Sequence, residues 1–162
     1  MKKINHGQPN IRGINYQQWA AIALFLQYCK FNDFEYIHLE PRKEKDFNLK
    51  LEKQTFICEA KNRQKAVSHS LLLSILKDIQ KNRSLTEIKI LIVSNKVSNS
   101  LLKDVKNYKY WPDRIKPKFK GYSNRELSLL PFVDFWVIDQ ENLKSLVYAL
   151  LKTLSTTGYR RK

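Results

Sequence analysis

The sequence predicts an α/β domain in which helices flank a mixed β-sheet. Strand-like and helix-like segments follow one another in the order α-β-β-β-α-β-α-β-α. The first three strands are joined by short connections, which favour antiparallel pairing, whereas helices separate the later strands, as in parallel crossovers. At 162 residues the chain is expected to form a single domain that covers residues 1–162.

The first helix is expected within residues 13–31, GINYQQWAAIALFLQYCKF, and its middle is apolar nearly all round, which predicts burial on more than one side. Asn15 is the expected N-cap of this helix, with Gln18 three residues later as its capping-box partner. A first strand, FEYIHLE at 34–40, is then ended by Pro41.

Residues 44–62 predict a β-hairpin. Two runs rich in β-branched and aromatic residues, DFNLKL at 46–51 and TFICEAK at 55–61, flank the polar turn EKQ. A helical stripe of apolar residues follows at 66–82, and IKILIVSN at 88–95 is apolar enough for a strand that is buried on both faces.

Three elements complete the order: a short helix at 98–108, a strand at 132–139, and a closing helix at 141–154 with Asp139 as its expected N-cap. Residues 106–131 fit no regular element and interleave aromatic rings with lysine and arginine. Loops of this length within a compact domain are usually functional or disordered.

Charge favours a polyanionic partner. Thirty Lys and Arg against fifteen Asp and Glu give a formal net charge of +15, which favours nucleic acid, although a lysine-rich composition alone is the simpler alternative. The longest apolar run, 19–26, is shorter than the roughly 20 residues of a membrane span, so no membrane partner is expected. The N-terminus lacks the apolar segment of a signal peptide, which predicts a cytoplasmic protein. Cys29 and Cys58 form no CxxC pair and are expected to be reduced, mostly buried thiols.

Three charged residues converge in the expected hairpin. Glu59 and Lys61 are two apart on one strand and point the same way, and Asp46 opens the strand beside them. Two carboxylates could hold Mg²⁺, with Mn²⁺ as a substitute, while Lys61 orients a water or stabilises charge on a phosphate. The alternative is a solvated surface pair, because acid-x-Lys triplets also occur at 87–89 and 104–106, although neither of these has a hairpin partner.

With Asp46 on the second strand and Glu59-Ala60-Lys61 on the third, the sequence resembles the PD-(D/E)xK nuclease superfamily, also called restriction-endonuclease-like. The segments GINYQQWAAIALFL, IHLEPRKEKDFNLKL and CEAKN are similar to the double-stranded DNA nuclease domains of bacterial anti-phage effectors. The resemblance spans about residues 13–95 and lacks the proline before the aspartate, where Lys45 stands.

This resemblance implies a restriction-endonuclease-like αβββαβ core and a Mg²⁺-dependent DNA endonuclease that serves phage defence, restriction or a mobile element. Asp46 and Glu59 would be the metal ligands, Lys61 the catalytic lysine and Gln17 a residue that orients the site. Two alternatives remain open: a catalytically inactive nuclease-like fold that serves as a nucleic-acid-binding or accessory subunit, and a metal-independent RNA-processing enzyme.

Further residues are candidates for the same function. Glu40 is either an additional acid of the site or a surface residue at a strand end. The expected partner is double-stranded DNA, and a homodimer is expected because two strands must be cut. The basic residues expected to contact nucleic acid are Arg42, Lys43, Lys45, Arg63, Lys65, Lys116, Lys118 and Lys120.

Overall fold

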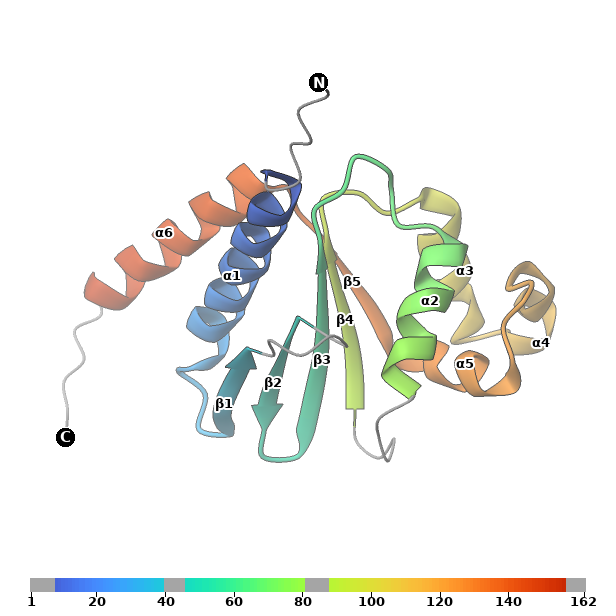
Figure 1. The fold of residues 1–162 in the computed structure, drawn as a ribbon. Helices are drawn as coiled ribbons and strands as arrows, with labels where there is room; N and C mark the ends of the chain where they lie inside the picture. The colour runs from blue at the N-terminus through green and yellow to red at the C-terminus, as the bar shows by residue number, and fades with distance from the viewer. Residues whose placement is uncertain (1–7, 40–45, 81–87, 157–162) are drawn as a thin grey trace, which may run out of the picture.

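The computed structural model describes residues 8–39, 46–80 and 88–156, with side chains from Tyr16 onward. Within these residues, a mixed sheet has the strand order β1-β2-β3-β4-β5 (Figure 1). The strands are β1 (Phe34–Leu39), β2 (Phe47–Leu51), β3 (Gln54–Lys61), β4 (Ile88–Ser94) and β5 (Val133–Val137). The first three strands pair antiparallel, while β3, β4 and β5 run parallel.

Helices cover both faces of the sheet. The α-helices are α1 (Gln8–Tyr28), α2 (His69–Gln80), α3 (Asn99–Tyr108), α4 (Pro112–Ile115), α5 (Asn124–Leu129) and α6 (Gln140–Thr156). Two 3₁₀ turns, η1 (Lys116–Lys118) and η2 (Leu130–Phe132), lie between them in the chain. Figure 1 shows α1 and α6 side by side on one face of the sheet, with α2, α3 and α5 on the other.

The two faces carry separate hydrophobic cores because side chains alternate along each strand. The core beside α1 and α6 includes Tyr16, Ala20, Leu24, Phe47, Leu49, Cys58, Leu143 and Val147. The core beside α2, α3 and α5 includes Ile57, Leu72, Leu76, Ile90, Ile92, Leu101, Leu127 and Leu130. Since Ile57 belongs to the second core, alternation places Glu59 and Lys61 on the same face of β3 as Ile57.

Tyr16 fixes α1 against the carboxyl end of β5. Its side chain is fully buried, and its hydroxyl donates a hydrogen bond of 2.8 Å to the carbonyl oxygen of Ile138, just after β5. This bond satisfies a phenol that would otherwise be buried without a partner. The next residue in α1 is Gln17, which is therefore held near the end of β3 that carries Lys61.

The expected fold class is confirmed: the domain is α/β, its sheet is mixed, and its first elements follow the αβββαβ order. Asp139 is confirmed as the N-cap of α6, since its carboxylate accepts the backbone N–H of Asn142 at 2.8 Å. The expected N-cap at Asn15 is wrong, because α1 already begins at Gln8.

The expectation of no regular structure in 106–131 is also wrong. The segment folds into α4, η1, α5 and the start of η2, and a proline stands at the first position of α4 and at the second position of η1 and of η2. Ser123 and Glu126 form a reciprocal capping box at the start of α5. The segment is thus a folded part of the domain.

Cys29 and Cys58 are both free thiols, as expected. None of the helices in the described ranges combines the length and the apolar character that crossing a membrane requires.

Candidate functional site

The carboxyl end of β3 brings three charged side chains together. The Lys61 ammonium nitrogen lies 2.7 Å from an oxygen of Glu59 and 3.7 Å from an oxygen of Asp46, at the start of β2. The side chains of Glu59 and Asp46 are only 7% and 13% exposed, and that of Lys61 is 22% exposed. The structure therefore brings together three of the residues that the sequence predicted, in a largely desolvated position.

Asp46 is held from two further directions. One carboxylate oxygen accepts the backbone N–H of Ala60 on β3, at 2.6 Å. The other oxygen accepts a hydrogen bond from the side-chain amide of Gln17 on α1. We define Gln17, Asp46, Glu59 and Lys61 as the acidic-lysine cluster. Each of its members is positioned by contact with at least one other member.

Burial controls the proton affinity of this cluster. Desolvation raises the pKa of Glu59 and of Asp46 above their ordinary values, although the nearby Lys61 ammonium acts in the opposite direction on both. Burial lowers the pKa of Lys61, but the Glu59 and Asp46 carboxylates outweigh it, and the pKa of the amine ends above its usual range. Two buried acids beside one amine form a position where additional positive charge is favourable.

Two residues that sequence reasoning missed support the backbone around Lys61. Ser94, at the end of β4, is buried, and its hydroxyl lies 2.9 Å from the carbonyl oxygen of Lys61, to which it donates a hydrogen bond. Asn62 follows Lys61 and donates its side-chain amide to the Gln140 side chain of α6, at 3.0 Å. No local pattern reveals Ser94, because its role depends on the parallel register of β3 and β4.

Asn48 is a third residue that sequence reasoning missed. It lies two residues after Asp46 on β2, pairs with Ile57 of β3 and is 6% exposed. Its side-chain oxygen is buried and has no hydrogen-bond partner within the described residues. An orphaned acceptor of this kind requires explanation, and an ordered water or a hydrated ion would supply the missing donor. The period-two alternation with Phe47 and Leu49 is the signal that could have identified it.

The donor chemistry of the cluster fits Mg²⁺ in part. Within the described residues, no three His, Cys, Asp or Glu side chains gather as a metal site. Mg²⁺, however, is commonly held by one or two carboxylates together with waters and substrate phosphate oxygens. Asp46 and Glu59 would hold such an ion, and the open acceptor of Asn48 suits one of its waters.

The structure places the predicted basic residues in different regions. Arg63 and Lys65 are exposed in the loop after β3, close in sequence to Lys61. Lys116 and Lys120 are also exposed, but they belong to the segment around α4 and α5, which Figure 1 shows beyond α2 and α3 as seen from β2. Glu40, Arg42, Lys43 and Lys45 lie outside the described residues.

Lys118 has a structural partner that the sequence did not reveal. Its ammonium group lies 2.9 Å from one carboxylate oxygen of Asp104, and His69 approaches the other oxygen at 3.2 Å. Asp104 is 5% exposed, so this contact ties η1 to α3 and to the start of α2. Phe119, beside Lys118, is buried as well. Both residues thus serve the packing of the segment.

No protein-family model and no curated protein sequence matches this chain. The fold is similar to a solved structure described as a Moraxella osloensis Cap4 SAVED/CARF-domain containing receptor, with a TM-score of 0.62 and 16% identity. The match covers 91% of this chain and 38% of that one.

The same kind of receptor from Acinetobacter baumannii, solved with the cyclic trinucleotide 2′3′3′-cAAA, matches with a TM-score of 0.64 and 12% identity. This match covers 87% of this chain and 35% of the receptor. The same receptor with 3′3′3′-cAAA gives a TM-score of 0.61 at 9% identity, over 87% of this chain and 37% of that one. The chain thus spans little more than a third of these proteins.

These findings correct the family drawn from the sequence. The similar structures are described as SAVED/CARF-domain containing receptors, two of them holding a cyclic trinucleotide, and not as PD-(D/E)xK nucleases. On this comparison the assignment to that superfamily is wrong, and so are three expectations drawn with it: the DNA endonuclease function, the nucleic-acid-binding accessory alternative and the double-stranded DNA partner. What the comparisons establish for this chain is its fold.

Proposed function

We propose that this chain recognises a nucleotide phosphodiester and hydrolyses it with Mg²⁺ at the acidic-lysine cluster. The observation that carries the proposal is the position of Lys61, whose ammonium group lies within 3.7 Å of two carboxylates at a sheet end. An ordinary surface pair would be solvated, whereas the Glu59 and Asp46 side chains are less than a seventh exposed. Buried titratable groups in such an arrangement are typical of functional sites.

Each member of the cluster has a chemical role in this proposal. When bound, Mg²⁺ would polarise the phosphate and lower the pKa of a bound water. Asp46 and Glu59 would hold the ion, and Gln17 fixes the orientation of Asp46. Lys61 stabilises the charge that develops on the phosphate. Water adds to phosphorus, the P–O bond to the leaving alcohol breaks, and a proton from the water ends on the alcohol oxygen.

The similar structures suggest the first ligand to test. Two of them were solved with cyclic trinucleotides, whose internucleotide bonds are phosphodiesters. We therefore place this chain in a receptor-type system that responds to cyclic oligonucleotides, in a setting of antiviral defence. The cytoplasmic location, the homodimer and the use of Mn²⁺ in place of Mg²⁺ stay predictions.

A hydrolysis assay tests the proposal. The purified chain is incubated with Mg²⁺ and, separately, with 3′3′3′-cAAA, a linear oligoadenylate and a plasmid, and the products are separated by chromatography or gel. We expect the wild type to hydrolyse the cyclic or the linear oligoadenylate. In Asp46→Asn and Lys61→Met the rate of hydrolysis should fall at least 100-fold, the order expected when a charged group that stabilises the transition state is removed.

A matched control comes from the exposed pair of Lys144 and Glu141 on α6, 2.9 Å apart. Lys144→Met makes the same charge change away from the cluster and should keep the wild-type rate. Equal loss in Lys144→Met, no hydrolysis of any substrate, or hydrolysis of the plasmid alone would each contradict the proposal.

A second function is favoured by the ligands in the similar structures: binding of a cyclic oligonucleotide as a signal, without turnover. Calorimetry with 3′3′3′-cAAA in the presence of a chelator measures binding without Mg²⁺-dependent hydrolysis. Saturable binding by wild type and Asp46→Asn alike, with no product formed in Mg²⁺, would favour sensing over hydrolysis.

A further inference from the structure

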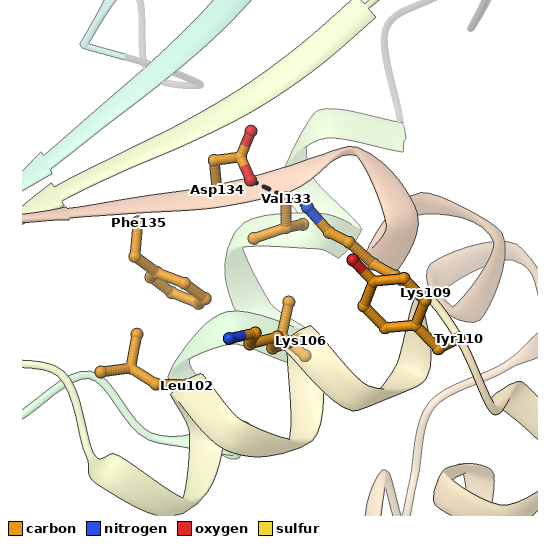
Figure 2. Close-up of a pocket in the computed structure, with 8 residues that line it drawn as sticks. Leu102, Lys106, Lys109, Tyr110, Val133, Asp134 and Phe135 are labelled. Carbon is orange, nitrogen blue, oxygen red and sulfur yellow. Dashed lines mark hydrogen bonds and ion pairs between the residues drawn. The ribbon is translucent and has the colours of Figure 1, made fainter.

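A pocket of about 360 Å³ lies between α3 and β5, on the far side of β4 from the β3 strand that carries Glu59 and Lys61 (Figure 2). β3 and β5 run in the same direction through the parallel half of the sheet. Through β4, Phe135 of β5 is in register with Glu59 of β3, but β4 lies between the two strands, and none of the residues that line the pocket belongs to the cluster. The pocket is therefore a separate site.

The pocket has an apolar floor and one aromatic wall. Val105 and Val133 are buried beneath it, and Leu102 and Phe135 are partly buried beside them. The Tyr110 side chain forms a further wall and is 68% exposed, so the face of its ring is open to a ligand. A flat, partly apolar ring could be buried here, since aromatic rings stack favourably on one another.

Two lysines of α3 and its C-terminal end give the pocket its charge. The Lys109 ammonium lies 2.8 Å from an Asp134 oxygen and is neutralised by it. Lys106 has no acidic partner in the part of the chain that the structure describes. Figure 2 shows its amine directed between Leu102 and Phe135, along the floor of the pocket. An unpaired ammonium above an apolar floor favours an anionic ligand.

We propose that this pocket binds a nucleoside monophosphate or a nucleotide unit of that size. The phosphate would meet Lys106, and the base would stack on Tyr110 above the apolar floor. Small-molecule pockets usually measure about 300 to 1,000 Å³ and combine apolar walls with a few placed polar groups, which describes this site. The site requires neither Mg²⁺ nor the acidic-lysine cluster, so it stands independently of the proposed hydrolysis.

Calorimetry with 5′-AMP as the probe tests this site in the full chain, with adenosine and ribose 5-phosphate as partial ligands. We expect saturable binding of 5′-AMP and at least tenfold weaker binding of each partial ligand. Lys106→Met should weaken 5′-AMP binding about tenfold, and Tyr110→Leu should weaken it by a similar factor. Asp134→Asn should strengthen binding, because it releases Lys109 to the phosphate.

Lys103→Met is the matched control, since Lys103 is an exposed lysine of the same helix that does not line the pocket. It should bind 5′-AMP as the wild type does. The proposal is overturned by an absence of binding, by equal weakening in Lys103→Met and Lys106→Met, which would indicate attraction by net charge alone, or by equal affinity for adenosine and 5′-AMP. Circular dichroism of each variant confirms that a loss of binding is not a loss of folding.

Discussion

Ser94 and Lys61 stand on neighbouring parallel strands, and the Ser94 hydroxyl donates to the Lys61 carbonyl oxygen at 2.9 Å. The same hydroxyl lies 3.0 Å from the carbonyl oxygen of Lys96. Because Ser94 is 1% exposed, water has little access to replace this bond.

Ser94→Ala should therefore lower the free energy of unfolding by about 1 to 2 kcal/mol, the usual cost of leaving a buried polar group without its partner. Urea unfolding followed by circular dichroism measures it. Ser128→Ala is the control, because the exposed Ser128 hydroxyl bonds the Arg125 carbonyl oxygen and should change stability by less than about 0.5 kcal/mol. Equal effects of the two substitutions would show that burial of Ser94 has no energetic importance.

The pairing of Lys61 with Glu59 predicts strong coupling between them. Lys61→Met leaves two buried carboxylates without their cation. It should lower the free energy of unfolding by about 3 kcal/mol, the lower end of the range for breaking a buried pair. The double variant with Glu59→Gln and Lys61→Met should lose less free energy of unfolding than the two single variants together. The difference, the coupling energy, should be about 1 to 3 kcal/mol. Chemical unfolding at neutral pH, without divalent cations, measures all four proteins. Effects that add to within about 0.5 kcal/mol would contradict the coupling.

The contact of Asp104 with Lys118 and His69 predicts that Asp104 anchors the segment that follows α3. Asp104→Ala should lower the free energy of unfolding by about 1 to 3 kcal/mol, since it removes the buried carboxylate that both Lys118 and His69 contact. Limited proteolysis should also become faster between α3 and α5. Asp113→Ala, which changes an exposed aspartate of α4, should alter neither property. An Asp104→Ala protein with wild-type proteolysis would exclude the anchoring role.

The capping box of α5 predicts a pH-dependent contribution to stability. Burial acts to raise the pKa of Glu126, but hydrogen bonds from the Ser123 side chain and backbone outweigh it, and the pKa lies below its ordinary value. A carboxyl whose pKa is lowered by folding stabilises the folded state above its unfolded pKa, which is about 4.3 for glutamate. This stabilisation is lost as the pH falls through the folded pKa.

Glu126→Gln should accordingly be less stable than the wild type at pH 7, by about 0.5 to 1 kcal/mol, the lower range for a helix cap. The difference should shrink as the pH falls below about 4, because the wild-type carboxyl is then protonated as well. Thermal unfolding of both proteins from pH 3 to pH 7 measures this difference in stability. A difference that stays constant over this range would mean that the charge of Glu126 contributes nothing.

Alternation and hairpin pairing were sufficient to predict the convergence of Asp46, Glu59 and Lys61. These features are local, because Glu59 and Lys61 lie on β3 and Asp46 directly precedes β2, to which β3 is joined by a tight turn. Ser94 and Asn62 could not be predicted in this way, since their partners come from the register of β3 with β4 and from the docking of α6. Both of these depend on tertiary packing.

The segment after α3 shows a second limit. Its helices are three to six residues long, too short for a hydrophobic period to be recognised. The available signals were the prolines at helix starts and the spacing of Ser123 and Glu126, both of which mark helix termini.

The acid-x-Lys triplet at 104–106 also shows why that pattern alone is weak evidence for a site. It lies on a helix, where the buried Asp104 and the exposed Lys106 point in different directions.

The hairpin of β2 and β3 also has a consequence for the order of folding. Asp46, Glu59 and Lys61 belong to this one hairpin, whereas Gln17 and Ser94 reach it from α1 and β4. Hairpins form in about 1 to 10 μs, well before most non-local contacts of a mixed sheet. We therefore expect the ammonium and the two carboxylates to meet while they are still hydrated. Neutralisation would then precede burial, and the arrival of α1 and β4 would enclose charges that are already balanced.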